Sequence, residues 1–524
     1  MSLKRNIAAV SALSLIGALS LNAVSSLISN ENTANAAAKF GDINSDGYID
    51  AVDASILLRY YSYASTAEGT PVSLEKFLAG DTGKTESTTS DTSDKDVSLN
   101  KGGDTFTILS WNNSDVPELI ANWTGIYVED VEKNLSSGSG NEITAPSGAK
   151  INFINVNSAG LYASEAYDEI FNSGDDVDVY FAEPYWALKY MDNDKRSSPL
   201  SALGITEKDM SEWYPYTKTL AKNSNGVFKS VPYDVSPGAF MYRSDLAEEY
   251  LGAKTPEAMQ TAIGDWDKFS SSAKTIAEKS EGKVALADSI GGMWEAYSCG
   301  RFDFVTSDNR FNESDDIKYF ADMAKELWDV GGVAKDDQWT DFWTQNGRDG
   351  FCMGYFVPSW AFYYNGSFVS EAAKGQEGKW SICEGPQAFY WGGNDILVNP
   401  STDNGDDARS FILSAAFNSE SMKHFACFND MTNNMSVNAQ LAKDNTYHAD
   451  EMIDIFRGEN YYTVFDQSAR KIDIKKYTPY DESIKSIIVE TIKRSYLDGN
   501  RSWDDTLNVT LDKIAEAHTF LEWD

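Results

Sequence analysis

The sequence predicts an α/β protein that is preceded by a small helical module built around a calcium loop. Three observations lead to this prediction: an acidic loop at residues 42–53, a Thr/Ser/Asp-rich stretch at residues 81–104, and an alternation of apolar strands with helices after it. Such an alternation predicts a mostly parallel sheet with helices on both faces. The chain has 524 residues, 42% of them hydrophobic, which is enough for more than one domain.

Residues 1–38 are expected to be a cleaved signal peptide. Lys4 and Arg5 precede a largely apolar run, and Ala34-Asn35-Ala36 is a small-residue cleavage motif. The serines and Asn22 make this run a poor permanent membrane span, and no other apolar run approaches the roughly 18 residues of a transmembrane helix. The protein is therefore expected to be secreted, extracellular or associated with the cell surface, with no membrane insertion after signal removal.

Residues 42–53 have the pattern of a calcium-binding loop. A loop of about 12 residues offers oxygen ligands at positions 1, 3, 5, 7, 9 and 12, and it needs glycine at position 6, where the chain turns sharply. Gly47 stands at that position. Ca²⁺ is thus the expected cofactor, because a merely acidic turn would not match at every ligand position. The expected ligands are Asp42, Asn44, Asp46, the carbonyl of Tyr48, Asp50 and Asp53.

The segment around this loop resembles a type I dockerin module. A helix-loop-helix sensor closes its loop with Glu, whereas this chain has Asp53, no entering helix and a clear exit helix at residues 54–61. The resemblance covers residues 39–80 and implies that a cohesin module of a scaffoldin is a partner. A standard dockerin carries two such loops. Here residues 73–80 read as a lone helix in place of the second loop.

Residues 81–104 are expected to form a flexible linker, because a polar stretch without aromatics cannot bury enough surface to offset its ordering entropy. Beyond it, strands are predicted at residues 105–111, 150–156 and 177–182, with helices at 116–123 and 164–171 between them. This order predicts a parallel sheet whose ligand-binding loops follow the carboxyl ends of the strands. Those loops begin at Trp111 and Glu183.

The order of segments in residues 105–524 is similar to that of the extracellular solute-binding proteins of sugar ABC importers (family 1, maltose-binding-protein-like). The similarity rests on four segments. They are DVDVYFAEPYWALKYM at 176–191, SPLSAL at 198–203, GVFKSVPYDVSPGAFMYRSDLAEEYLG at 226–252 and RDGFCMGYFVPSWAF at 348–362. The resemblance implies a two-lobed periplasmic-binding-protein-like fold (class II), whose lobes are joined by crossover strands and close over a ligand in a cleft.

A sugar ligand predicts which residue types should line this cleft. A pyranose has apolar CH faces and a rim of hydroxyls, so it needs aromatic platforms together with carboxylate or amide partners. For any single aromatic residue, packing in the core is an equally good explanation. Two glycines before Asn394 would allow the backbone to approach the ligand. The expected ligand-binding residues are Trp111, Asn112, Glu183, Tyr185, Trp186, Asp234, Tyr242, Trp294, Trp360, Trp391, Asn394 and Asp395.

Composition narrows the classes of partner. The formal net charge is -36, from 80 acidic against 44 basic residues, which argues against nucleic acid because its phosphates would be repelled. The four cysteines show no pairing motif. They are expected to be buried free thiols, with one or two disulfide bridges as the alternative.

Three functions remain open at this point. The favoured one is a non-catalytic oligosaccharide-binding protein that the dockerin-like module attaches to a cohesin-bearing scaffold or the cell surface, next to polysaccharide-degrading enzymes. The second is a conventional ABC-importer component, with a membrane permease as partner. The third is a dockerin-bearing glycoside hydrolase, which would need a pair of carboxylates flanking the scissile bond. The resemblance to two-lobed binding proteins disfavours catalysis, so the protein is predicted not to be an enzyme.

Overall fold

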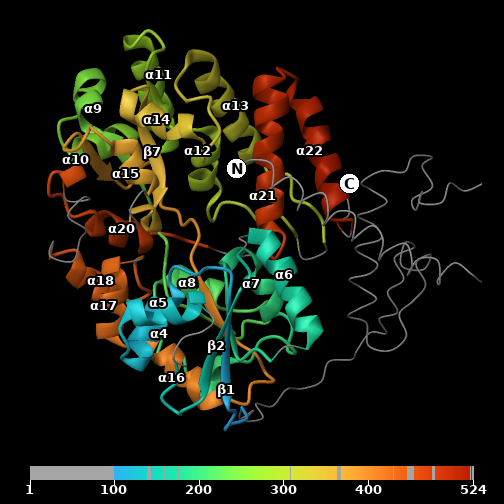
Figure 1. Cartoon of the computed structure of the whole chain (residues 1–524). Helices are drawn as coiled ribbons and strands as arrows, with labels where there is room; N and C mark the ends of the chain where they lie inside the picture. The colour runs from blue at the N-terminus through green and yellow to red at the C-terminus, as the bar shows by residue number, and fades with distance from the viewer. Residues whose placement is uncertain are drawn as a thin grey trace, which may run out of the picture. The chain divides into compact units, whose positions relative to one another are not determined.

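The structure is a computed structural model of the whole chain, shown in Figure 1. It describes residues 99–137, 143–157, 160–174, 176–306, 309–362, 367–428, 430–444, 454–474, 478–519 and 521. The chain divides into two compact units, residues 1–95 and 96–524, and all described residues belong to the second unit. The predicted signal peptide and calcium loop lie outside the described residues, as does nearly all of the linker. The domain boundaries predicted there therefore stay predictions.

The first lobe is built on a five-stranded sheet with the strand order β2-β1-β3-β9-β4. Strands β1, β2 and β3 are parallel, and β9 runs antiparallel between β3 and β4. The predicted strands and their parallel pairing are confirmed. A late strand, far along the chain, completes the sheet. The strands are β1 (Thr105–Ser110), β2 (Lys150–Asn155), β3 (Val179–Ala182), β4 (Ser230–Pro232) and β9 (Asp395–Val398).

Helices cover both faces of this sheet, because β1, β3 and β9 bury apolar side chains on both sides. Phe411 packs edge to face on Phe106 and Trp123 in the core on one side. Tyr167 and Trp186 pack on the other side. In Figure 1, α4 and α5 lie on one side of β1 and β2, and α6 lies on the other. The helices of this lobe are α4 (Val116–Thr124), α5 (Val128–Ser137), α6 (Gly160–Ser173), α7 (Pro184–Met191), η1 (Leu200–Leu203) and α16 (Gly405–Ala416).

The second lobe has a four-stranded sheet with the order β6-β7-β5-β8. Its strands are β5 (Gly238–Arg243), β6 (Ala285–Ala287), β7 (Cys352–Pro358) and β8 (Trp380–Cys383). Two hydrophobic clusters cover the two faces of the sheet. The helices that supply side chains to the first cluster are α9 (Ser244–Leu251), α10 (Pro256–Ile263), α11 (Trp266–Lys279), α12 (Ile290–Ser298), α13 (Asp315–Val330), α21 (Asp481–Thr491), the π-helix η4 (Ile492–Asp498) and α22 (Trp503–Ala517).

The other face of this sheet is covered by helices from three separate stretches of the chain. One of them, α17, supplies Met422 to this core and Phe425 to the core of the first lobe, so it lies between the lobes. These helices are α8 (Pro215–Leu220), α14 (Asp341–Asp349), η2 (Ser359–Phe362), α15 (Phe368–Ala373), α17 (Ser419–Phe428), α18 (Met435–Leu441) and α20 (Tyr461–Ala469).

Three chain segments pass between the lobes side by side. They are residues 233–237 between β4 and β5, residues 384–394 between β8 and β9, and the segment around residues 430–434 that leads from α17 to α18. Asp234 bridges to Thr432, and Pro237 bridges to Tyr390, both in antiparallel sense. Because the first segment is bonded to each of the other two, the two lobes share one connecting hinge. The predicted two-lobed architecture is confirmed.

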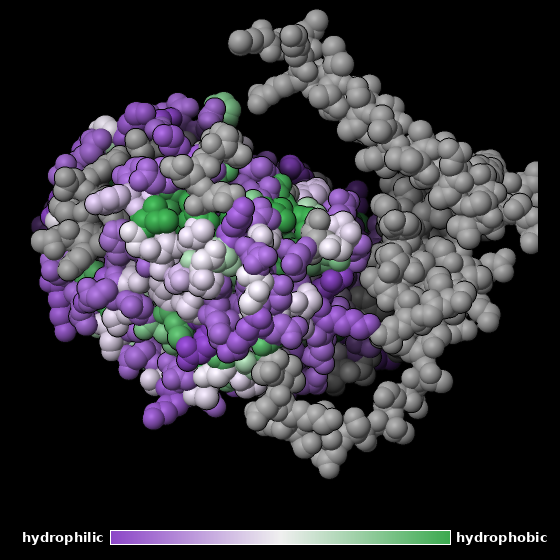
Figure 2. All heavy atoms as spheres, turned by 60° about the horizontal axis from the view of Figure 1, so that its bottom comes forward, coloured by the Kyte–Doolittle hydropathy of each residue, from purple (hydrophilic) through white to green (hydrophobic). Residues whose placement is uncertain are grey.

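The described cysteines carry free thiols, and the exterior is mostly hydrophilic on the face shown in Figure 2. Cys299, Cys352 and Cys383 are free; Cys352 and Cys383 are buried as expected, whereas Cys299 is partly buried. The face shown in Figure 2 is mostly hydrophilic, with scattered hydrophobic patches. Among the described helices, none is both long and apolar enough to cross a membrane.

The hinge leaves no room for a side chain at Gly238, where β5 begins. A Cβ atom there would overlap the buried ring of Phe389 on the neighbouring hinge segment, whose carbonyl accepts a 2.7 Å hydrogen bond from the Gly238 amide. We expect Gly238→Ala to lower the free energy of unfolding by about 1–3 kcal/mol through overpacking, as measured by chemical denaturation. Adding Phe389→Leu should recover part of this loss. A fully additive double mutant would contradict the proposed steric contact.

Candidate functional site

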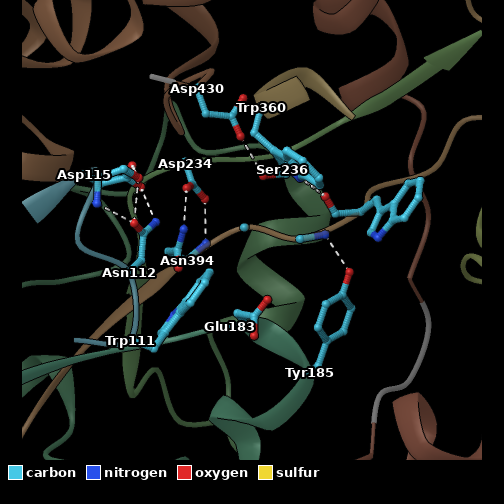
Figure 3. A pocket seen from close by; sticks show the side chains of 14 residues that line it. Trp111, Asn112, Asp115, Glu183, Tyr185, Asp234, Ser236, Trp360, Asn394 and Asp430 are labelled. Atoms are coloured by element: carbon cyan, nitrogen blue, oxygen red, sulfur yellow. Dashed lines mark hydrogen bonds between the residues drawn. The ribbon is translucent and has the colours of Figure 1, made fainter. Parts of the chain in front are cut away.

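A pocket of about 430 Å³ lies at the hinge, within the range of about 300–1,000 Å³ that is usual for ligand sites. Its wall combines loops of the first lobe, the hinge segments and η2 of the second lobe (Figure 3). The lining residues are Trp111, Asn112, Ser114, Asp115, Glu183, Tyr185, Asp234, Ser236, Trp360, Trp391, Gly392, Gly393, Asn394 and Asp430.

The structure brings eight of the twelve expected ligand-binding residues together in this wall. Trp111 and Asn112 follow the carboxyl end of β1, and Glu183 follows β3 as the N-cap residue of α7. Neighbouring parallel strands bring these loops to one edge of the sheet, as predicted. The other five that line the pocket are Tyr185, Asp234, Trp360, Trp391 and Asn394.

Two glycines with left-handed backbone shape the loop that carries Trp391 and Asn394. Gly392 has φ 91° and Gly393 has φ 101°, where a side chain is strained. A Cβ on Gly392 would lie 2.8 Å from Nε1 of Trp360. The amide of Gly392 instead donates to the hydroxyl of Tyr185 at 2.5 Å, as Figure 3 shows. These glycines thus allow the backbone to lie close to pocket side chains, while the expected approach to a ligand stays a prediction.

Asp115 is a buried carboxylate at one side of the pocket. Its oxygens accept hydrogen bonds from the Tyr233 hydroxyl at 2.8 Å, from Ser114 at 2.8 Å and from the Asn112 amide at 3.1 Å. Burial raises the pKa of Asp115, and these hydrogen bonds partly oppose the rise.

Asp234 and Asp430 are buried carboxylates on two different hinge segments. Asp234 accepts hydrogen bonds from the backbone amide of Asn394 at 2.6 Å and from its side-chain amide at 3.0 Å. Asp430 accepts from Ser236 at 2.6 Å and from Ser359. Burial, followed by repulsion from Asp430, raises the pKa of Asp234 well above its usual value, and burial raises the pKa of Asp430 to about 6.

Two buried polar atoms of the pocket wall have no hydrogen-bond partner among the residues that the structure describes. They are Oδ1 of Asn394, a residue that is 7% exposed, and Nε1 of Trp111. A buried polar group without a partner costs free energy, and such exceptions mark places where a ligand or water supplies the missing bond. The pocket therefore offers one acceptor and one donor to a guest molecule.

Four of the expected ligand-binding residues lie outside the pocket wall. Trp294 is completely buried in the second lobe, where its ring packs on Phe320 and its Nε1 donates to the carbonyl of Lys485. Trp186 packs edge to face on Tyr167 and donates to Glu183. For these two tryptophans, core packing is the correct explanation, since their indole N–H groups are bonded within the fold.

Tyr242 and Asp395 are the other two. Tyr242 is buried in β5, in the same core as Trp294. Asp395 is the first residue of β9 and is fully buried, which raises its pKa to about 8. Side chains alternate between the two faces of a strand, so Asp395 points away from the side that Asn394 lines. The sequence could not give the register that decides this.

Several pocket residues were not anticipated. Ser114 and Asp115 lie in the same loop as Trp111, which was already expected to bind the ligand, so the sequence could have indicated them as well. Ser236 follows Asp234 at a spacing of two, the period of an extended segment, which was also available in the sequence. Asp430 enters from the third hinge segment, and no local pattern points to it.

Trp339 extends the aromatic surface beside the pocket. It is 55% exposed, its ring stacks on Trp360 with centroids 5.9 Å apart, and it meets Trp391 edge to face at 5.5 Å. Its φ of 66° places a bulky residue in the left-handed region. Strained backbone of this kind often occurs at ligand-binding sites. Asp337, two residues earlier, is held by Lys493.

The fold and the pocket together define a two-lobed protein that holds a small ligand between its lobes. A family model described as bacterial extracellular solute-binding protein matches residues 141–454. The chain belongs to this family. A search of the curated proteins finds no similar sequence.

Solved structures share the fold at low sequence identity. A crystal structure described as extracellular solute-binding protein family 1 has a TM-score of 0.64 at 18% identity, over 79% of this chain and 99% of that chain. The galacto-N-biose-/lacto-N-biose I-binding protein of the ABC transporter from Bifidobacterium longum, in complex with lacto-N-biose, is also similar. Its TM-score is 0.58 at 15% identity, over 80% of this chain and 99% of that chain. An ABC transporter-associated binding protein from B. animalis subsp. lactis Bl-04, in complex with beta-1,6-galactobiose, has a TM-score of 0.54 at 17% identity, over 80% of this chain and 99% of that chain.

Membership of this family settles two of the predictions. Its members bind solutes and are not enzymes, which confirms the expectation of a non-catalytic protein. They are extracellular proteins, in agreement with the predicted location outside the cytoplasm.

Because the backbone of Trp339 is left-handed, replacing this residue by glycine or by alanine should give proteins of different stability. Glycine adopts positive φ without strain, whereas alanine does not. We expect Trp339→Gly to have a free energy of unfolding about 1 kcal/mol higher than Trp339→Ala, as measured by urea denaturation of both variants. Equal stability of the two would show that position 339 carries no backbone strain.

Proposed function

We propose that this protein is the sugar-binding component of an ABC importer, which captures an oligosaccharide between its lobes and presents it to a membrane permease. The observation that carries the proposal is the pocket itself, in which aromatic rings and hydrogen-bonding groups face one cavity at the hinge. Closure of two lobes around a hinge encloses a ligand that contacts both of them.

The chemistry of the wall suits a sugar. Trp111, Trp360, Trp391 and Tyr185 offer flat apolar faces for the CH groups of pyranose rings. Carboxylate and amide groups beside them can accept and donate hydrogen bonds to hydroxyls. Two proteins of the same fold are binding proteins of ABC transporters in complex with beta-1,6-galactobiose and lacto-N-biose, which supports the proposal by analogy of fold.

The importer interpretation takes precedence over attachment to a scaffold, which the sequence had favoured. The family and the similar binding proteins of ABC transporters support the importer, whereas support for a cohesin partner comes from residues 39–80 alone. A dockerin-like module at that position is compatible with either role. Cohesin binding therefore stays a prediction from the sequence.

We also propose that residues 42–53 bind Ca²⁺. The proposal is supported by oxygen-bearing residues at the ligand positions, from Asp42 to Asp53, and by Gly47 at the sharp turn. Metal binding in such a loop contributes directly to the folding of a small module, since the ligands come together only in the folded state.

The sugar proposal is tested by calorimetric titration with malto-, cello-, xylo-, manno- and galacto-oligosaccharides, followed by product analysis of each cell. We expect binding of at least one series with the sugar left intact. Trp391→Ala should weaken that binding by about 1–3 kcal/mol, because a burial and stacking partner is lost.

Trp294→Ala is the matched control, because Trp294 lies in the core outside the pocket wall. It should lower the free energy of unfolding by about 3–5 kcal/mol and leave the dissociation constant of the folded protein unchanged. If Trp391→Ala loses stability and keeps its affinity, Trp391 is a packing residue. Cleaved sugar would contradict the binding function altogether.

The calcium proposal is tested on the full chain by nuclear magnetic resonance. Adding a chelator should collapse the amide dispersion of residues 39–80 and leave the spectrum of residues 105–524 unchanged. Asp46→Ala should reproduce the effect of the chelator in the presence of calcium. A spectrum that does not respond to the chelator would refute metal binding by this loop.

A further inference from the structure

All charged residues among the described lining of the pocket are acidic. Four of its residues are acidic, namely Asp115, Glu183, Asp234 and Asp430, and none of the described lining residues is Lys, Arg or His. Lys485 lies near the pocket, with its ammonium 5.8 Å from the ring of Tyr185. It pairs with Glu295 at 3.0 Å and with Glu482 at 3.2 Å, so its charge is already compensated.

Neutral groups alone supply the described hydrogen bonds of the three buried carboxylates. Asp115 is bonded to hydroxyl and amide groups, Asp234 to Asn394, and Asp430 to serine hydroxyls and a backbone amide. These bonds satisfy lone pairs, but they supply no positive charge. Buried carboxylates of this kind are normally paired with a cation or coordinate a metal.

Burial is the main cause of the raised pKa values of Asp115, Asp234 and Asp430, and repulsion from neighbouring carboxylates adds to it for Asp234 and Asp430. A positive charge placed among these carboxylates would stabilise their ionised forms. The described carboxylates do not come together in an arrangement that could hold a metal ion. The missing charge is therefore best supplied by a ligand.

Aromatic rings line the same cavity and favour the same kind of ligand. Trp111, Trp360, Trp391 and Tyr185 all line the pocket. The face of an indole or phenol ring attracts an ammonium group within about 6 Å of its centre. Aromatic faces combined with carboxylates are a general means of recognising organic amines.

The unpartnered Oδ1 of Asn394 is an independent sign that the ligand carries a donor. The Asn394 side chain is 7% exposed and lines the pocket, and its amide nitrogen is already bonded to Asp234. The free oxygen can only accept a hydrogen bond, and an ammonium group has donors and no acceptor. Asn394 therefore offers the pocket an acceptor oxygen beside the carboxylate of Asp234.

We propose that the preferred ligand is an amino sugar, a saccharide with a free, protonated amino group, and that the acidic wall selects it over neutral and anionic sugars. The inference rests on the proposed sugar-binding function and names the ligand class of the same site. The amine lies among the acidic groups, while the pyranose faces stack on the tryptophans.

The test compares matched sugars that differ at one position. The β-1,4-linked trimers of glucose, glucosamine and N-acetylglucosamine share their backbone and carry a hydroxyl, an ammonium or a neutral amide at C2. Glucose, galactose and mannose are each paired with the corresponding 2-amino sugar in the same way. Spermidine is added as a linear amine without a sugar, and glucuronic acid as an anionic sugar. All are titrated by calorimetry with the full chain, at a pH where the amines are protonated.

We expect at least one amino sugar to bind at least about tenfold more tightly than its neutral partner, since an opposite charge at close range shifts such equilibria by that amount. This preference should shrink as salt is added. The N-acetyl sugar should lose the preference, because it keeps the nitrogen and not the charge. No binding of glucuronic acid is expected.

A variant of one acidic wall residue tests whether the preference for amino sugars arises in the pocket wall. Glu183→Gln keeps the shape of a partly exposed wall residue and removes one charge. It should weaken binding of the amino sugar several-fold more than binding of its neutral partner. Glu207→Gln, an exposed acidic residue of the same lobe outside the pocket wall, is the matched control and should change neither. Trp391→Ala, in contrast, should weaken amino and neutral sugars alike.

Each alternative outcome has a separate meaning. Neutral sugars that bind as tightly as their amino partners would overturn this inference and leave the proposed function intact. Binding of spermidine without binding of any sugar would overturn the proposed function and the sugar part of this inference. If none of these compounds binds, both proposals fail.

Discussion

Asp234 accepts hydrogen bonds from the backbone and the side chain of Asn394, and in this way it joins two of the three segments that pass between the lobes. Asp430 joins the third segment to the same place through Ser236 and Ser359. Buried carboxylates must be bonded to be tolerated, so these segments are held in one arrangement. The pocket floor and the hinge consist of the same residues. Ligand binding and movement of the lobes therefore act on one set of contacts.

The aromatic part of the wall is held by contacts of a different kind. Nε1 of Trp360 donates to the carbonyl of Trp391 at 2.7 Å, and the hydroxyl of Tyr185 accepts from Gly392. These bonds connect η2, the first turn of α7 and the loop before β9, which belong to both lobes and the hinge. Groups fixed before the ligand arrives lose little entropy on binding. The aromatic part of the pocket is thus largely preorganised, while Oδ1 of Asn394 and Nε1 of Trp111 have no partner among the described residues.

Much of the first sheet could be predicted from the sequence, because parallel strands buried on both faces leave apolar runs separated by helices. The strands predicted at residues 105–111, 150–156 and 177–182 are found at residues 105–110, 150–155 and 179–182. The loops after β1 and β3 could be assigned to one edge of the sheet by topology alone. The antiparallel insertion of β9 between β3 and β4 was not foreseen, since pairings between strands so far apart in the chain, such as Tyr180 with Leu397 and Ser230 with Leu397, leave no local mark.

By itself, the sequence determined the kinds of residue at the site, namely tryptophans and carboxylates at the ends of strands, and the two glycines that allow a close backbone approach. Only the tertiary structure decided which of them meet. Trp111 and Trp294 have the same side chain, yet one lines the pocket and the other is enclosed by Phe320 and Phe302 in the core. The reason is physical: an apolar ring gains free energy by burial against protein or against ligand alike. Composition and local pattern cannot separate the two, and the packing of distant segments does.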